Sequence, residues 1–301
     1  MTTLSLTEGR ASSTSWRDYL ALCKLRVVAV MLITLVVGFC LATPAAPDAW
    51  LLVLTSLGVG LAAASAAAVN HVLDASIDSR MARTARRPLP QGRVSQRNAL
   101  IFAAVLGCLG ITLLNLAVNA VTAWLTLASL IGYAGIYTAI LKRATPQNIV
   151  IGGVAGAAPP LLGWTAVTGS VDFQGLLLML IIFAWTPPHF WALCIARRDD
   201  YARAGVPMLP NTHGVAYTHT QILLYTLLTI LATLLPFLTG MSGWLYLVGV
   251  TLINLRLLQW ALILKRSSDA SIPMKMFRYS IVYIMVLFAI LLVDHYWPAF
   301  V

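Results

Sequence analysis

The sequence predicts an all-α integral membrane protein with nine transmembrane helices, and three observations support this fold class. Of its 301 residues, 59% are hydrophobic and only 10% are charged, whereas soluble domains contain about 25% charged residues. The mean hydropathy of +0.84 is typical of a chain that has lipid as its solvent. Apolar stretches that approach the roughly 20 residues needed to cross a bilayer recur along the chain. This composition excludes a soluble globular protein, because so few charged side chains cannot cover its surface in water.

Nine apolar segments are expected to cross the membrane. Backbone groups in lipid must find their hydrogen-bond partners within the segment, so each segment is predicted to be a helix rather than a strand. Short links join the segments. The predicted spans are residues 27–41, 50–70, 99–118, 120–140, 149–168, 175–196, 220–238, 244–264 and 277–296.

The basic residues predict how the chain is oriented. Eighteen of the 20 Lys and Arg residues lie before the first span or in alternate links, and a nineteenth, Arg278, lies at the adjoining end of the ninth span; the opposite links contain none. The positive-inside rule then places the N-terminus in the cytoplasm, and nine crossings place the C-terminus outside. We therefore expect a multi-pass protein of the bacterial inner (cytoplasmic) membrane. The net charge of +10 reflects this topology, so the expected environment is the lipid bilayer and no nucleic-acid partner is expected.

The chain is expected to contain one folded unit. Residues 1–20 are polar and rich in Ser and Thr, which predicts a disordered cytoplasmic tail. Residues 21–301 are predicted to form a single polytopic membrane domain.

Two carboxylates and an amide recur every four residues at the end of the second span. On a helix this spacing places Asn70, Asp74 and Asp78 on one face. Hard oxygen ligands of this kind suit Mg²⁺, which commonly bridges protein carboxylates and substrate phosphates. The alternative is a solvated helix end whose acidic residues pair with nearby arginines.

A second acidic site follows the sixth span, four spans after the first. It comprises Arg197, Arg198, Asp199, Asp200 and Tyr201, and the segments 81–90 and 201–210 after the two sites are similar. Two sites separated by an even number of spans share one membrane face. This arrangement predicts two parallel four-helix repeats around a central cavity, with a ninth helix added.

These motifs closely resemble those of the heme O synthase branch of the UbiA superfamily of intramembrane prenyltransferases. The resemblance covers the chain from about residue 16 onward. It rests on the pattern N-x-x-x-D-x-x-x-D-x-x-M-x-R-T-x-x-R-P-L at residues 70–89, and on residues 141–150 and 185–191. The wider superfamily has a second D-x-x-x-D motif, whereas Arg203 and Ala204 stand here four residues after Asp199 and Asp200. The number of Mg²⁺ ions, one or two, therefore stays open.

The resemblance implies a Mg²⁺-dependent enzyme that transfers the farnesyl group of farnesyl diphosphate to the 2-vinyl group of heme b, giving heme O. Residues 21–301 would then be a prenyltransferase domain. The implied metal ligands are Asn70, Asp74, Asp78 and Asp199. The implied catalytic residues are Asp74, Asp78, Lys142, Arg83 and Arg87, of which the basic ones stabilise the leaving diphosphate. The other expected substrate-binding residues are Asn70, His71, Arg143, His189, Arg198, Asp199, Asp200, Tyr201 and Arg203.

Two histidines are candidate contacts for heme, either to its iron or to a propionate. These are His71, within the first motif, and His189, in the sixth span. An alternative for His189 is that its ring satisfies backbone groups left free by Pro187 and Pro188.

Two other functions are compatible with parts of the sequence. One is prenyl transfer to an aromatic quinone precursor. The other is transport of an ion or small solute, for which carboxylates near the bilayer midplane would be expected. If heme O is the product, a heme A synthase or a terminal-oxidase assembly factor is the expected protein partner.

Overall fold

The computed structural model describes residues 14–43 and 46–297, and this part of the chain is built from helices without strands. Eight helical segments in the described part are long and apolar enough to cross a membrane. The pair α1 (Trp16–Leu22) and α2 (Leu25–Leu41), which meet at a bend of 51°, gives a ninth crossing if counted together. Each predicted span corresponds to one or two helical segments, so the all-α membrane fold is confirmed.

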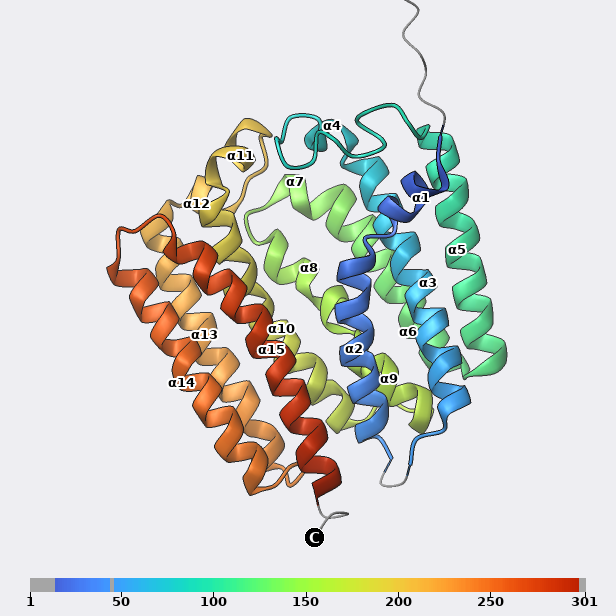
Figure 1. Ribbon diagram of the computed structural model, residues 1–301, viewed down its shortest axis with the longest axis vertical. Helices are drawn as coiled ribbons and strands as arrows, with labels where there is room; N and C mark the ends of the chain where they lie inside the picture. Colours follow the sequence, from blue (N-terminus) through green and yellow to red (C-terminus); the bar gives the residue numbers. More distant parts are fainter. Residues whose placement is uncertain (1–13, 44–45, 298–301) are drawn as a thin grey trace, which may run out of the picture.

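The spans lie side by side along the long axis of the molecule (Figure 1). After α2 they are α3 (Ala49–Leu73), α5 (Gln96–Ala117), α6 (Ala120–Ile131) with the π-helix η1 (Gly132–Leu141), α8 (Asn148–Ala157) with α9 (Pro159–Thr168), α10 (Phe173–Ala196), α13 (Val215–Leu238), α14 (Trp244–Arg266) and α15 (Ile272–Tyr296). Short helices connect some of them, namely α4 (Ala75–Asp78), α7 (Lys142–Ala144), α11 (Arg198–Arg203) and α12 (Leu209–Thr212).

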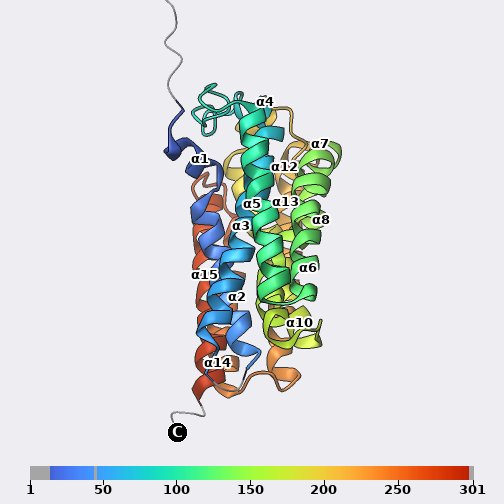
Figure 2. The same ribbon diagram turned by 90° about the vertical axis from the view of Figure 1, so that its right-hand side faces the viewer.

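The short helices follow the predicted repeat. The span α3 runs into α4, and α10, four spans later, runs into α11 and α12. Figure 1 shows α1, α4, α7, α11 and α12 at one end of the bundle, and Figure 2 shows the same segregation from the side. The two acidic motifs therefore lie at the same end of the molecule, as the repeat predicts.

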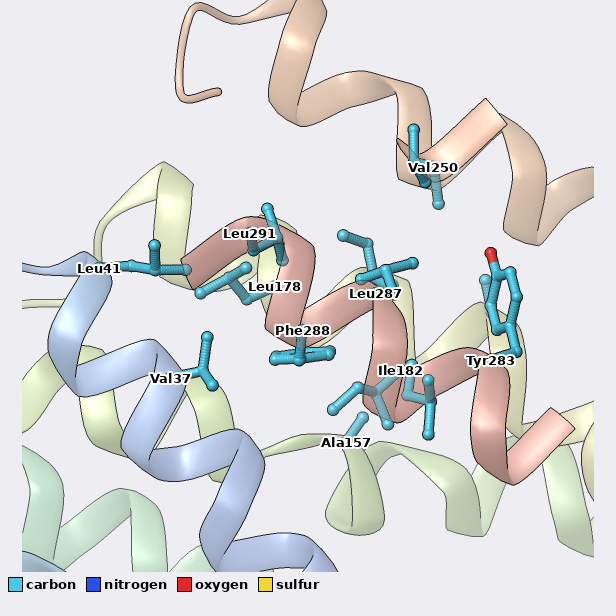
Figure 3. Packing of buried hydrophobic residues seen from close by; sticks show 14 of the residues in the cluster. Val37, Leu41, Ala157, Leu178, Ile182, Val250, Tyr283, Leu287, Phe288 and Leu291 are labelled. Carbon is cyan, nitrogen blue, oxygen red and sulfur yellow. The ribbon is translucent and has the colours of Figure 1, made fainter. Parts of the chain in front are cut away.

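The last helix, α15, closes the bundle between its two halves. It packs against α2, α10 and α14 through a row of buried apolar side chains. Figure 3 shows Tyr283, Leu287, Phe288 and Leu291 of this helix facing Leu178 and Ile182 of α10, Val37 and Leu41 of α2, Ala157 of α8 and Val250 of α14. The ninth helix is thus an integral part of the core.

The N-terminal segment differs in part from its prediction. Residues 1–13 of the expected disordered tail lie outside the described residues, whereas residues 16–20 belong to α1. A capping box starts this helix, with the Ser15 amide donating to Asp18 Oδ2 at 3.1 Å. Arg93 Nη1 donates to the other oxygen of Asp18 at 2.7 Å. Reading residues 15–18 as part of a polar tail overlooked this cap.

Candidate active site

Asn70, Asp74 and Asp78 form a ladder at the junction of α3 and α4. The Asp74 amide donates to the Asn70 carbonyl at 2.9 Å, and the Asp78 amide donates to the Asp74 carbonyl at 2.7 Å. The helical spacing therefore continues across the junction, as the sequence predicts. All three side chains are buried, so this helix end is not solvated, although Asp78 does pair with an arginine, as that alternative expected.

Cationic side chains from three separate segments surround this ladder. Lys142 Nζ, at the start of α7, donates to Asp74 Oδ2 at 2.5 Å. The side-chain Nδ2 of Asn70 donates to the same oxygen at 2.8 Å. Arg87 Nη1 donates to Asp78 Oδ2 at 2.6 Å. Lys24, between α1 and α2, donates to Asn70 Oδ1. The ladder and these cations form what we call the acid–base cluster: Lys24, Asn70, Asp74, Asp78, Arg87 and Lys142.

The donor set of the cluster fits a Mg²⁺ ion. The second oxygen of Asp74, Oδ1, is buried and has no hydrogen-bond partner among the described residues. A buried carboxylate oxygen without a partner is costly, and a hard cation would satisfy it. Asp78 supplies a second carboxylate from the next helical turn.

Asp199 lies apart from the acid–base cluster. Its side chain is exposed at the start of α11. In the described part of the chain no three acidic, His or Cys side chains gather closely enough to share a metal ion. The expected four-residue set of Asn70, Asp74, Asp78 and Asp199 is thus not assembled in this structure.

The second motif contributes a buried tyrosine and an internal ion pair. Asp200 is buried and pairs with Arg203. Tyr201 is also buried, and burial raises the pKa of its phenol above the ordinary value, whereas the nearby Arg83 opposes that shift. Tyr201 belongs to the same buried cluster as Ile77 and Met81, so it is the member of the second motif that packs beside the segment of the first. Arg198 is exposed.

The loop after α4 and the helix after η1 hold the rim of the cluster. Thr84 Oγ1 donates to the Asp78 carbonyl at 3.0 Å, which fixes the segment that carries Arg83 and Arg87. Arg83 itself is exposed. Arg143 Nη2 donates to the Leu73 carbonyl at 2.7 Å, so this side chain caps the end of α3.

The π-helix η1 was not predicted from the sequence. Thr138 Oγ1 donates to the Tyr133 carbonyl five residues earlier at 2.8 Å. The same hydroxyl accepts from the side-chain Nδ2 of Asn70 at 3.2 Å. The rings of Tyr133 and Tyr137 stack with their centroids 5.5 Å apart. Single π-turns are often found at functional sites, and this one directs Thr138 towards Asn70.

A cavity of about 580 Å³ lies inside the bundle. This volume is within the range of about 300–1,000 Å³ typical of small-molecule sites. Lys24 lines the cavity and also bonds Asn70, so it connects the cavity with the acid–base cluster. Most of the wall is apolar, contributed by α2, α3, α6, α8, α9, α10 and α15.

The two candidate histidines lie in different places. His189 lines the cavity, and its Nδ1 lies 2.7 Å from Ser280 Oγ of α15. The alternative that this ring satisfies backbone groups freed by Pro187 and Pro188 is therefore wrong. His71 is buried and does not line the cavity, and neither of its ring nitrogens has a partner among the described residues.

Residue 24 is the main site residue that the sequence analysis missed. Its contact with Asn70 joins positions 46 residues apart, which no local motif specifies. The one available signal was a lysine directly before an apolar span, where the positive-inside rule already explained it.

Comparison with known proteins identifies related chains. Residues 31–282 match the model of the UbiA prenyltransferase family. A protein named protoheme IX farnesyltransferase from Marinobacter nauticus is 59% identical over 286 residues, covering 95% of each chain.

Solved structures share the fold. A structure described for digeranylgeranylglyceryl phosphate synthase superposes with a TM-score of 0.78 at 19% identity, covering 93% of this chain and 98% of that one. A UbiA homolog from Archaeoglobus fulgidus, bound to GPP and Mg²⁺, superposes with a TM-score of 0.62 at 19% identity, covering 91% and 99% of the two chains.

Proposed function

Because this chain belongs to the UbiA prenyltransferase family, we propose that it transfers the farnesyl group of farnesyl diphosphate to the 2-vinyl group of heme b. The products are heme O and diphosphate. The observation that carries the proposal is the buried acid–base cluster joined by Lys24 to an apolar cavity. The relative from Marinobacter nauticus is named for the same activity.

The acid–base cluster suits the diphosphate end of the substrate. Asp74 and Asp78 would hold Mg²⁺, with Asn70 beside them. When bound, Mg²⁺ supplies charge neutralisation to the diphosphate as it leaves. Lys24 and Lys142 place two ammonium groups next to the ladder, and Arg87 adds a guanidinium. These fixed cations stabilise negative charge that grows on the diphosphate as the allylic C–O bond breaks.

The second motif and the rim would contribute less directly. Tyr201 packs beside the segment of the first motif and would present its phenol to the leaving group. Arg83 and Arg198 are exposed at the same end and attract the anionic substrates. Asp199 would add a ligand only if α11 moved towards the ladder. Asp200 and Arg203 hold the shape of α11 through their ion pair.

The cavity suits the farnesyl chain and the acceptor. Its apolar wall would keep water from the allylic cation until the vinyl carbon of heme attacks it. The attack forms the new C–C bond and leaves a cation beside the porphyrin ring. Addition of one water molecule and loss of a proton give the hydroxyethylfarnesyl group. No strong general base is required for this sequence of steps.

The cellular setting follows from the same proposal. A multi-pass enzyme of this kind would lie in the inner membrane of a bacterium with its basic loops in the cytoplasm. Heme O would pass to a heme A synthase or to the assembly of a terminal oxidase.

The decisive experiment compares acceptors with purified protein, Mg²⁺ and farnesyl diphosphate. With heme b we expect release of diphosphate and a more hydrophobic heme of the mass of heme O. Release with 4-hydroxybenzoate and not with heme would contradict the proposal and favour a quinone precursor.

Replacing Asp74 with Asn tests the cluster in the same assay. The change removes the charge that would hold Mg²⁺ and leaves Lys142 without its carboxylate, so we expect the rate to fall about 100-fold or more. Asp269→Asn is the matched control, because Asp269 is exposed in the loop before α15 and should retain the full rate. Full activity of a folded Asp74→Asn protein would remove Asp74 from the mechanism.

A further inference from the structure

The ring of His189 is held on three sides by its neighbours. Its two faces stack against Trp185, at a centroid distance of 4.2 Å, and Phe277, at 4.6 Å. One edge of the ring carries Nδ1, 2.7 Å from the hydroxyl of Ser280. The only part of the imidazole left for a ligand is therefore the other edge, which carries Nε2.

The contacts of Ser280 favour one tautomer of His189. The Ser280 hydroxyl lies 2.7 Å from the Phe277 carbonyl, which can only accept a hydrogen bond. A hydroxyl that donates its single proton there accepts at its contact with His189, and Nδ1 is then the protonated nitrogen. The Ser280 carbonyl also accepts from Trp185 Nε1 at 2.9 Å. One residue of α15 thus fixes both the imidazole and an indole that stacks on it.

Ser280 and His189 differ in their access to the cavity. Ser280 is 2% exposed and lies behind the wall, whereas His189, Trp185 and Phe277 line the cavity. With Nδ1 turned towards Ser280, Nε2 presents an in-plane lone pair on the cavity side. A lone pair of this kind binds a metal, and it cannot donate a hydrogen bond to a propionate.

We propose that Ser280 is a positioning residue that holds His189 as the Nδ1-protonated tautomer, so that Nε2 ligates the iron of the heme acceptor in the cavity. This inference rests on the proposed function, because it takes a metalloporphyrin as the second substrate. It chooses iron over propionate as the target of His189. Metal-binding histidines usually donate their other ring proton to a neighbouring acceptor, and loss of that acceptor typically costs about 10–100-fold in affinity.

The test measures binding of ferric heme b to the full-length protein without farnesyl diphosphate. Wild-type protein should give the absorption and electron paramagnetic resonance spectra of a histidine-ligated heme. His189→Ala should lose that signature, and added imidazole should restore it. Ser280→Ala should weaken heme binding about 10-fold or more, whereas Ser280→Thr, which keeps the hydroxyl, should bind within about 3-fold of wild type.

Ser65→Ala is the matched control. Ser65 is also a buried helical serine whose hydroxyl donates to a carbonyl, that of Ala103 at 2.7 Å, and it does not line the cavity. We expect no change in the heme spectrum of this variant. Size-exclusion profiles and binding of a non-hydrolysable farnesyl diphosphate analogue report whether each variant is folded.

The outcomes separate this inference from the proposed function. An unchanged heme spectrum in folded His189→Ala would overturn the iron assignment, even if heme O is formed. Wild-type affinity and spectrum in Ser280→Ala would overturn the positioning role. Histidine-ligated heme without any farnesyl transfer would contradict the proposed function alone.

Discussion

At the scale of single residues, Lys24 has an unusual backbone conformation. It is the only non-glycine residue with positive φ in the described part of the chain, at 49°. A side chain in this left-handed region costs roughly 1–2 kcal/mol. The conformation places its ammonium group on Asn70 Oδ1, beside the carboxylate of Asp74. Strain of this kind is commonly found at functional positions.

The variant Lys24→Gly tests the effect of the backbone conformation of this residue separately from the effect of its charge. Glycine adopts a positive φ readily, so we expect the thermal unfolding temperature to stay the same or rise. Loss of the amino group leaves Asn70 Oδ1 without its donor and removes a cation from the diphosphate end of the cavity. The rate of farnesyl transfer at low farnesyl diphosphate should therefore fall about 10-fold or more.

The control for this change is Lys275→Ala, in the first turn of α15. Lys275 is exposed and its nearest carboxylate oxygen, of Asp269, is 3.9 Å away. Its loss should leave the rate unchanged. A Lys24→Gly enzyme with wild-type kinetics would show that the ammonium group plays no part in binding the diphosphate.

Residues of the site could be predicted from the sequence only where their spacing is local. Asn70, Asp74 and Asp78 share a face because helical geometry fixes it over four-residue steps. Lys142 and Lys24 meet the same ladder through tertiary contacts that depend on how α2, α3 and η1 pack. For the same reason the sequence could name His189 but not its partner Ser280, 91 residues away.

At the scale of elements, the backbones of α2 and α9 approach each other very closely. A Cβ added to Gly163 would lie 2.1 Å from the Leu35 carbonyl oxygen, and one added to Gly38 would lie 2.1 Å from the Pro160 carbonyl oxygen. Two backbones can approach this closely only where side chains are absent. Both helices also line the cavity, so their separation sets its width.

Gly163→Ala should therefore destabilise the protein. The added methyl group must push apart two backbones, and we expect a loss of about 1–3 kcal/mol in the free energy of unfolding. Thermal unfolding in detergent measures the change. Gly60→Ala is the matched control in α3, because a Cβ there would meet only the Leu32 side chain, at 3.5 Å or more. Equal unfolding temperatures for the two variants would show that α2 and α9 can separate without cost.

Helices were predictable where hydropathy alone specifies them, and local breaks were not. The nine apolar segments match helices because each must satisfy its own backbone in lipid. The π-helix η1 has the same apolar composition as α6, so hydropathy cannot distinguish the two. The helix α10 likewise continues through Pro187 and Pro188, although proline in a helix interior removes a backbone hydrogen bond.

At the scale of the whole molecule, the number of crossings decides on which side each end of the chain lies. In the described residues, eight helical segments are each long and apolar enough to cross a membrane. The bent pair α1 and α2 therefore decides whether the number of crossings is eight or nine. In Figure 1, α2 runs from the end that holds α4 and α11 to the opposite end, where α15 terminates. A segment of this length, 17 residues of apolar sequence, suffices for a helix to cross a thin or locally deformed bilayer.

Fusions to the C-terminus test the nine-crossing topology directly. The links that carry the basic residues lie, in the described part of the chain, at the end that holds the acid–base cluster, which predicts that this end faces the cytoplasm. Nine crossings then put the C-terminus in the periplasm of a Gram-negative host. Alkaline phosphatase fused after residue 301 should be active, because it folds only when exported, and green fluorescent protein fused there should be dark.

The opposite pair of results would contradict this topology. A fluorescent and phosphatase-inactive C-terminus would mean that α2 does not cross, or that the whole bundle is inverted. Green fluorescent protein fused to the N-terminus separates these two cases. If α2 does not cross, the N-terminus stays in the cytoplasm and this fusion fluoresces. If the whole bundle is inverted, the N-terminus is exported and the fusion is dark.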